Sequence, residues 1–336
     1  MTLYGQSSRR GGSSPPSGTA LHVCHAGSLL AAFNQLEEEF KKQHPTVTVV
    51  DTSGGSVDLV RRFAAGGLEC DVIAPADDLV IDTMLKPAKL ADYTIVFASG
   101  RMVLAYIVKD PKTAALRVSG SFNPPSSIPQ VSAGWYDVLT ASGVRISGAH
   151  PFMDPGGYRA HMIFELAQKH YKVPGLYNSL LQHYQVNVAD PSGPAAVLGK
   201  DFSFQFTYEH TAAAAAQRDS SYRYVRLPTE IDLSSVQASS RSGSSDPPIG
   251  VTIPGLGIPG SSASVSIPAS TVGWGVTIPV NSRNRENAIA FVSSLLGPAG
   301  RAALMANGPT ALPRPRVSRL DYQRLPDALQ RLTVAN

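Results

Sequence analysis

The chain has 336 residues, of which 43% are apolar and 16% charged, enough to bury the core of one large or two medium domains. The net charge is +4 and no basic run exceeds a pair, which argues against a nucleic-acid partner. No stretch of about 18 apolar residues occurs, so no membrane-spanning helix is expected.

The N-terminal residues and the two cysteines give two further expectations. Residues 1–19 are small and polar and contain no apolar signal core, so we expect a disordered segment without a recognisable secretory signal in the sequence as given. Cys24 ends one predicted strand and Cys70 starts another. In a parallel sheet such positions lie at opposite edges, which predicts two buried free thiols.

From residue 20 onward, short β-rich runs alternate with stretches of helical periodicity. Strands are expected at 20–25, 46–51 and 71–74, with a helix that Ser28 caps and that runs to His44, and a second helix that ends at Gly66. This alternation predicts an α/β fold with a parallel sheet. Later strands are expected at 102–108, 202–207, 222–226 and 271–280. Later helices are expected at about 157–171, 175–184, 283–296, 299–306 and 326–333, with a loose loop or ragged hairpin over 234–270.

Two matching loops carry the functional signal. Gly27-Ser28 follows the first strand and Gly54-Gly55-Ser56 follows the second. Small residues, free backbone N–H groups and a helix dipole favour an anion at such a point, and the serine hydroxyl adds a donor. The carboxyl ends of neighbouring parallel strands would bring both loops together. The alternative is that each serine is a plain helix cap, and His25 is interpreted as a loop or packing residue.

A set of motifs, in order along the chain, resembles the molybdate/tungstate-binding proteins of ABC transporters, and their archaeal-type branch above all. The motifs lie at 26–29, 53–57, 71–77, 80–85, 91–106, 154–159, 227–231 and 284–289. The resemblance implies a two-lobed type II periplasmic-binding-protein fold, with each lobe a mainly parallel sheet flanked by helices. It places residues 20–106 and 226–336 in lobe I and 107–225 in lobe II, with 102–108 passing between the lobes.

The resemblance also implies a ligand set. Ser28, Ser56 and Asp154 match the motifs directly, and Tyr208 follows from Phe206-Thr207-Tyr208. An ungapped count places a second carboxylate at Asp190, where the family usually has glutamate. The nearby Glu209 would point elsewhere on its strand. The two serines and the tyrosine would hold oxo groups, while the two aspartates would coordinate the metal centre of the oxyanion.

The carboxylates need a physical reason, because two negative groups about 4 Å apart repel by several kcal/mol. An acid can bind the metal centre of tungstate or molybdate directly, accept a proton from hydrogen phosphate, or stay protonated itself. The carboxylates thus disfavour sulfate. The alternatives are an Asx turn at Asp154, an ordinary turn at Asp190 and a half-buried strand tyrosine at Tyr208.

We therefore expect a monomeric solute-binding protein, periplasmic or extracellular by resemblance, that captures tungstate or molybdate without a cofactor and delivers it to an ABC transporter permease. No nucleophile elbow, Walker loop or His-Glu-x-x-His motif is present, so no enzyme is expected. The alternatives are capture of another oxyanion, such as phosphate or sulfate, and a ligand-sensing domain outside transport.

Overall fold

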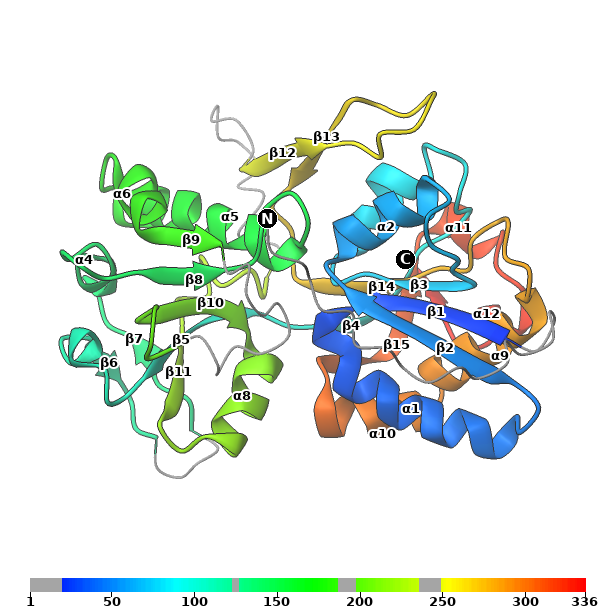
Figure 1. Cartoon of the computed structure of the whole chain (residues 1–336), viewed down its shortest axis with the longest axis horizontal. Coiled ribbons are helices and arrows are strands. Elements are labelled where there is room, and N and C mark those ends of the chain that lie inside the picture. The colour runs from blue at the N-terminus through cyan, green and yellow to red at the C-terminus, as the bar shows by residue number, and fades with distance from the viewer. Residues whose placement is uncertain (1–19, 123–126, 187–197, 236–248) are drawn as a thin grey trace, which may run out of the picture.

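Two lobes lie side by side in the computed structural model of the chain (Figure 1). The structure describes residues 20–122, 127–186, 198–235 and 249–336, so the predictions for residues 1–19 and for Asp190 lie outside the described residues. The two ends of the described chain build the first lobe, and its middle builds the second.

The first lobe holds two small sheets. One has the strand order β2-β1-β3 and is parallel throughout, as the sequence predicts; the other has the order β14-β4-β15-β16. The strands are β1 (Ala20–Ala26), β2 (Thr48–Gly54), β3 (Val72–Ala74), β4 (Ile95–Ser99), β14 (Gly273–Val276), β15 (Thr310–Val317) and β16 (Val334–Ala335). The helices are α1 (Leu30–Gln43), α2 (Ser56–Ala64), α3 (Asp78–Val80), α9 (Arg285–Leu296), α10 (Pro298–Asn307), α11 (Arg319–Tyr322) and α12 (Asp327–Gln330).

The second lobe is built on one seven-stranded sheet of order β6-β7-β11-β5-β10-β8-β9. Its strands are β5 (Met102–Ile107), β6 (Val118–Ser119), β7 (Gln130–Val131), β8 (Ile146–Gly148), β9 (Tyr184–Val186), β10 (Phe204–Tyr208) and β11 (Tyr222–Arg226). Its helices are α4 (Trp135–Leu139), α5 (Pro155–Tyr171), α6 (Leu176–His183) and α8 (Glu209–Arg218).

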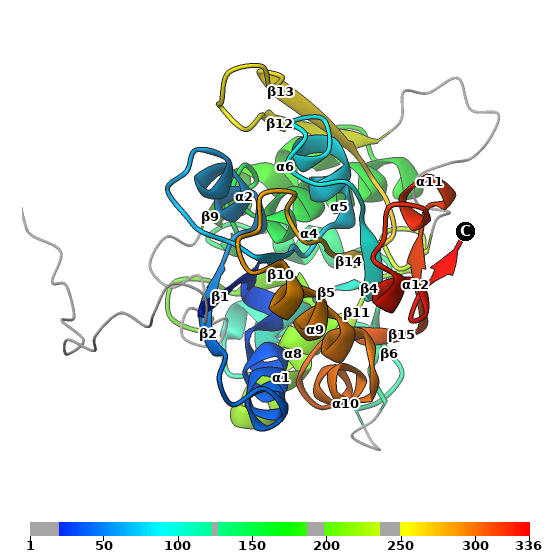
Figure 2. The ribbon, with the colours of Figure 1, turned by 90° about the vertical axis from the view of Figure 1, so that its right-hand side faces the viewer.

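The helices cover the sheets because their apolar residues recur on one side. In α2, Val57, Val60 and Phe63 recur every three residues and are buried, as predicted. Helices α1, α9 and α10 pack together on one side of the first lobe (Figure 2). Among the described residues no single helix is long and apolar enough to cross a membrane; only the bent pair α9 and α10 meets that test together.

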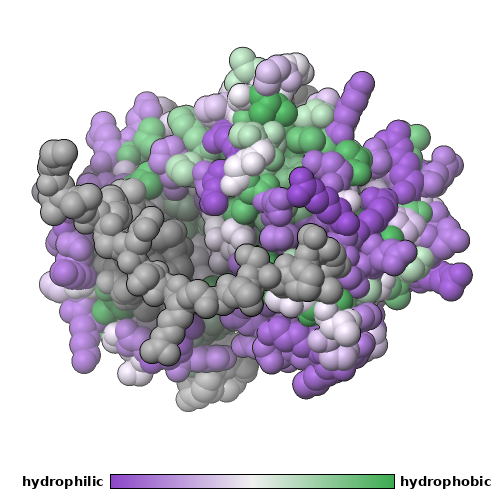
Figure 3. All heavy atoms as spheres, turned by 45° about the vertical axis from the view of Figure 1, so that its right-hand side comes forward, coloured by the Kyte–Doolittle hydropathy of each residue, from purple (hydrophilic) through white to green (hydrophobic). Residues whose placement is uncertain are grey.

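A two-stranded hairpin, β12 (Gly250–Pro254) and β13 (Ser264–Pro268), stands above the junction of the lobes (Figure 1). It occupies the segment in which the sequence predicts a loop or ragged hairpin. Strand β12 contacts α5 of the second lobe, and β13 contacts residues Ile81–Leu85 of the first. In Figure 3, hydrophobic residues gather near the upper middle of the visible face, whereas the outer flank of the first lobe is hydrophilic.

The chain crosses between the lobes before β5 and not along it. Strand β4 lies in the first lobe, and all of β5 pairs within the second-lobe sheet, so Gly100 and Arg101 make the crossing. The expectation that residues 102–108 pass between the lobes is therefore wrong. The connection is short because β4 ends only three residues before β5 begins.

The two cysteines form a disulfide, which overturns the prediction of free thiols. Their Cα atoms are 5.7 Å apart. The prediction assumed that the two positions lie at opposite edges of the sheet. Strand β3 has only three residues and pairs with Val23–His25, so Cys70, two residues before it, comes close to Cys24 in the adjacent strand.

Candidate functional site

The two Gly-Ser loops lie next to each other at the carboxyl ends of β1 and β2. The parallel register pairs Ala26 with Gly54, and a Cβ atom added to Gly27 would lie 4.0 Å from the carbonyl oxygen of Gly54. The predicted meeting of the loops at one sheet edge is thus what the fold produces.

Ser28 does not cap a helix, contrary to the prediction. It lies in a 3₁₀ turn, Gly27–Leu29, and α1 begins after it without a side-chain cap. Its hydroxyl accepts a hydrogen bond from Nε1 of Trp274 at 3.0 Å. Its carbonyl oxygen lies 2.9 Å from Nε2 of His210, and burial lowers the pKa of that imidazole to about 4. His210 is therefore neutral at pH 7, and its Nε2 carries the hydrogen because a carbonyl can only accept.

Ser56 is the first residue of α2, and its hydroxyl also does not cap the helix, because Gly55 occupies the cap position. The side chain is buried, and its hydroxyl accepts a hydrogen bond from the backbone N–H of Ala76 at 2.9 Å. Since neither serine makes a capping hydrogen bond, the plain-cap alternative fails for both residues.

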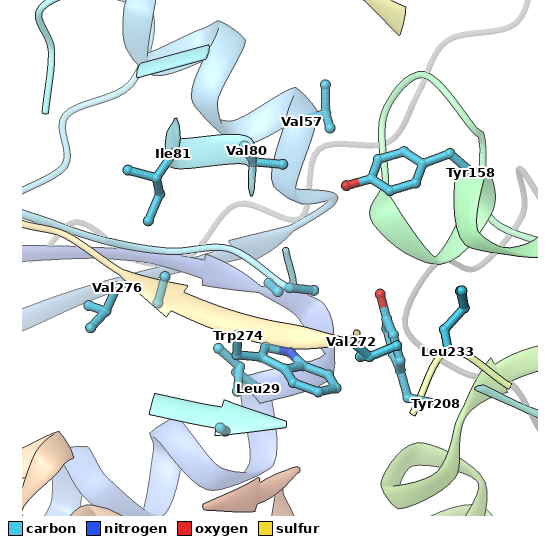
Figure 4. Packing of buried hydrophobic residues seen from close by; sticks show 14 of the residues in the cluster. Leu29, Val57, Val80, Ile81, Tyr158, Tyr208, Leu233, Val272, Trp274 and Val276 are labelled. Atoms are coloured by element: carbon cyan, nitrogen blue, oxygen red, sulfur yellow. The ribbon is translucent and has the colours of Figure 1, made fainter. Parts of the chain in front are cut away.

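Tyr208 ends β10 in the second lobe, and its hydroxyl accepts a hydrogen bond from Nη1 of Arg159 at 2.9 Å. Its ring meets that of Trp274 edge-on, with centroids 5.0 Å apart. Burial raises the pKa of the phenol, so Tyr208 keeps its proton at neutral pH. In Figure 4 the hydroxyl of Tyr158 points toward the first lobe below Val57, and the hydroxyl of Tyr208 points up toward Tyr158, beside Trp274.

The three hydroxyls share one hydrogen-bond arrangement. Each oxygen accepts a hydrogen bond from one N–H group, and none donates to an acceptor within the described part of the chain. A hydroxyl that already accepts still has its own hydrogen to donate. The loops and the end of β10 thus present three donors at the lobe junction.

Asp154 lies beside these donors. It caps α5, where Oδ1 accepts from the backbone N–H of Gly156 at 2.7 Å. A Cβ atom added to Gly156 would lie 3.0 Å from Oδ1 of Asp154 and 3.9 Å from the hydroxyl of Tyr208. Burial raises the pKa of Asp154, against the opposing effects of the Gly156 N–H and the charge of Arg159. Glu209 is paired with Arg101 and Arg226 and does not join the cluster.

The start of α2 is joined to the second lobe. The backbone N–H groups of Val57 and Asp58 both donate to the carbonyl oxygen of Met153 at 3.1 Å. The expectation that the amides at this helix start are free for an anion is therefore wrong for these two. Arg61, one turn further along α2, donates to the carbonyls of Phe152 and Gly255 at 2.5 and 2.9 Å and also to Pro254.

His25 is a packing residue, as predicted. It is fully buried, its ring lies 4.5 Å from that of Phe33, and its Nε2 lies 2.7 Å from Oδ1 of Asp51. Arg159, Trp274 and His210 are the contacts that sequence reasoning missed. Arg159 has a visible signal, because it ends the 154–159 motif on which the resemblance rests. No feature of the sequence marks Trp274 or His210 as part of the site.

Two α/β lobes with three hydroxyl donors at their junction are the architecture of a two-lobed binding protein. A sequence profile of the bacterial extracellular solute-binding proteins matches residues 21–309, and the chain belongs to this family. It is a family of solute-capture proteins and not of enzymes, as the sequence predicts.

The chain is similar in sequence to two solute-binding proteins and in fold to a molybdate-binding protein. It is 29% identical to an uncharacterised solute-binding protein of Methanoculleus marisnigri, over 93% of this chain and 86% of the relative. It is 27% identical to the molybdate/tungstate-binding protein WtpA of Thermococcus kodakarensis, over 86% and 81%. The periplasmic molybdate-binding protein of Azotobacter vinelandii superposes with a TM-score of 0.53 at 17% identity, covering 88% of this chain and all of that one. The predicted two-lobed type II fold and the resemblance are confirmed.

Proposed function

We propose that this chain captures a tetrahedral oxyanion between its lobes, with tungstate or molybdate favoured, and delivers it to an ABC transporter permease. The observation that carries the proposal is the shared arrangement of Ser28, Ser56 and Tyr208. Each hydroxyl already accepts one hydrogen bond from an N–H group and keeps its own hydrogen to donate to a ligand.

Such a set of donors suits a ligand whose outer atoms only accept. A fully ionised oxyanion meets this requirement, because every oxygen carries lone pairs and none carries a hydrogen. Hydrogen bonds to a charged acceptor are also the strong ones, at about 1.5–3 kcal/mol each.

The carboxylate of Asp154 favours an oxyanion with a metal centre. Its Oδ1 is used by Gly156, while Oδ2 is left for a ligand. An ionised carboxylate repels sulfate, whose sulfur takes no further ligand, but it can coordinate tungsten or molybdenum. Asp190 is proposed as the second such acid on the resemblance alone. The name of the Thermococcus relative, a molybdate/tungstate-binding protein, supports the same ligand pair.

The test is a melting-temperature screen in metal-free buffer against tungstate, molybdate, sulfate, phosphate and chromate. A ligand at 100 times its dissociation constant adds about 2.7 kcal/mol to the free energy of unfolding. We expect the two metal oxyanions to give the largest shifts, at a stoichiometry of 1:1. No shift with either of them rejects the ligand assignment, and a larger shift with phosphate or sulfate transfers the function to that anion.

Single Ser→Ala changes locate the site. Ser28→Ala or Ser56→Ala removes one donor, and we expect affinity to fall by about 1–3 kcal/mol. The exposed Ser264, on the outer hairpin, is the matched control, and Ser264→Ala should leave affinity unchanged. Full affinity in both loop variants would show that these hydroxyls do not touch the ligand.

A further inference from the structure

Arg159 is a buried cation beside the candidate site. It lies near the start of α5 with 1% of its surface exposed, and no other lysine or arginine of the described residues is buried. A buried guanidinium without partners would cost several kcal/mol, so the groups around it determine what it can do.

The guanidinium joins the two lobes. Nη1 donates to the Tyr208 hydroxyl at 2.9 Å and to the carbonyl oxygen of Ala76 at 2.5 Å. Nη2 lies 3.3 Å from Oδ2 of Asp77, which also accepts from the hydroxyl of Tyr158 at 2.6 Å. Tyr208 belongs to the second lobe, whereas Ala76 and Asp77 follow β3 in the first.

Through Ala76 the same side chain reaches a second ligand hydroxyl. Ala76 accepts from Arg159 through its carbonyl and donates through its N–H to Ser56 at 2.9 Å. Arg159 therefore contacts Tyr208 directly and is linked to the Ser56 hydroxyl by the backbone of Ala76. These two hydroxyls come from different lobes, and Arg159 connects them.

An arginine at this point fixes the direction in which Tyr208 donates. A guanidinium has only N–H donors, so the phenol oxygen must accept from it, and the phenol hydrogen must point elsewhere. A neutral residue that could both donate and accept would let the hydroxyl turn back. The planar fork of arginine also holds Nη1 at Tyr208 and Ala76 while Nη2 faces Asp77, a fixed two-nitrogen geometry that lysine does not have.

We propose that Arg159 is a positioning residue that orients the Tyr208 hydroxyl, and through Ala76 holds the Ser56 hydroxyl, so that both donate to the bound oxyanion. The inference rests on the proposed function. Asp77 keeps the guanidinium in place by neutralising it across the lobe junction. Arg159 acts on the ligand through Tyr208 and does not itself contact the ligand.

A double-mutant cycle with molybdate as the probe tests this role. Calorimetry would give the affinity of the wild type, Arg159→Met, Tyr208→Phe and the double variant. We expect each single change to weaken binding about tenfold, the effect of one lost hydrogen bond to a charged group. Because Arg159 acts through the hydroxyl, the double variant should also lose about tenfold and not a hundredfold.

Arg101→Met is the matched control. Arg101 is also an arginine at the lobe junction, bonded at 3.1 Å to the buried Asp232, but it touches none of the three hydroxyls. Its loss should leave molybdate affinity within about twofold, as expected for a change that breaks no ligand contact. If Arg159→Met does not fold, Arg159→Lys replaces it in the same cycle. Lysine keeps a positive charge but has a single nitrogen, whereas the guanidinium uses Nη1 for Tyr208 and Ala76 and Nη2 for Asp77.

The outcomes separate the inference from the function on which it rests. Suppose that the wild type binds molybdate and that the double variant loses about a hundredfold in affinity, the product of the two single losses. Arg159 is then only a structural ion pair, and the inference is overturned while the proposed function stands. An equal loss in Arg101→Met has the same consequence. If wild type binds none of the oxyanions in the screen, the proposed function fails and the inference falls with it.

Discussion

The carbonyl oxygen of Met153 lies 2.6 Å from the position that a Cβ atom on Gly55 would occupy. Gly55 precedes α2 in the first lobe, and Met153 precedes α5 in the second. Real Cβ atoms do not come this close to a carbonyl oxygen, so glycine is required here by the approach of the two lobes. Its own φ of −65° is open to any residue, which excludes backbone strain as the reason.

Gly55→Ala should therefore hold the lobes apart. The first lobe can fold as before, but Ser56 and Tyr208 would no longer reach the same ligand. Overpacking of this kind costs about 1–3 kcal/mol, so we expect molybdate affinity to fall roughly tenfold or more. Small-angle scattering with ligand present should show a larger radius of gyration than for the wild type.

The control is Gly67→Ala beyond the end of α2, where the nearest atom to an added Cβ would be 3.6 Å away. This variant should bind and scatter like the wild type. Wild-type affinity in Gly55→Ala would mean that the contact with Met153 is not needed for binding.

A buried acid on α1 predicts how stability depends on pH. Glu37 of α1 is only 7% exposed, and burial, followed by the charge of Asp51, raises its pKa to about 7. The folded protein holds this proton over a range in which the unfolded chain, with a pKa near 4.5, has lost it. Stability from this residue is therefore fully present below pH 4.5 and is lost as pH rises to about 7.

We expect Glu37→Gln to remove that dependence. The difference in free energy of unfolding between wild type and variant should change by about 1–3 kcal/mol between pH 4.5 and 7, with wild type losing stability as pH rises. Urea denaturation at several pH values measures it. The assignment to Glu37 would be contradicted if the free energies of unfolding of the two proteins changed in parallel with pH. It would also be contradicted if the wild type became more stable relative to the variant as pH rises.

The disulfide gives a redox prediction. Cys24 and Cys70 close a loop with a sequence separation of 46 residues, and a bridge of this kind contributes about 2–4 kcal/mol by restricting the unfolded chain. Reductant should lower the melting temperature of the wild type. The double change Cys24→Ser and Cys70→Ser should melt at the same temperature with and without reductant. An unchanged melting temperature of the wild type, after unfolding and refolding in reductant, would contradict a stabilising disulfide.

The sequence predicts the parts of the site that depend on local pattern. The loops of Ser28 and Ser56 each follow a strand of the parallel sheet and lead into a helix, so their meeting follows from that sheet. Strand alternation and the amphipathic face of α2 predicted the α/β fold for the same reason: both are short-range patterns.

The rest depends on how distant elements pack. Trp274 contacts Ser28 across 246 residues, and Arg159 contacts Ala76 across 83, so neither partner could be paired from periodicity. The thiols were misjudged because a three-residue β3 places Cys70 nearer to Cys24 than a full strand would. The capping role given to Ser28 failed because a 3₁₀ turn, which no local signal marked, precedes α1.

Asp154→Asn decides whether the acid coordinates the metal centre of the ligand. Asparagine keeps a side-chain oxygen for the N–H of Gly156, so the cap of α5 survives the change. If Asp154 coordinates tungsten, the neutral amide is a poorer ligand and tungstate affinity falls. If the carboxylate is only a nearby charge, the change removes repulsion and the affinity of every oxyanion rises.

The pH dependence of sulfate binding gives an independent check on the same residue. Burial raises the pKa of Asp154, so its protonated fraction grows as pH falls toward that value. Sulfate cannot be coordinated, so its affinity for the wild type should rise as pH falls, and Asp154→Asn should bind it with no such trend. X-ray absorption on the tungstate complex completes the test. Six light-atom neighbours around tungsten support coordination, whereas four oxo neighbours alone reject it and leave Asp154 as the cap of α5.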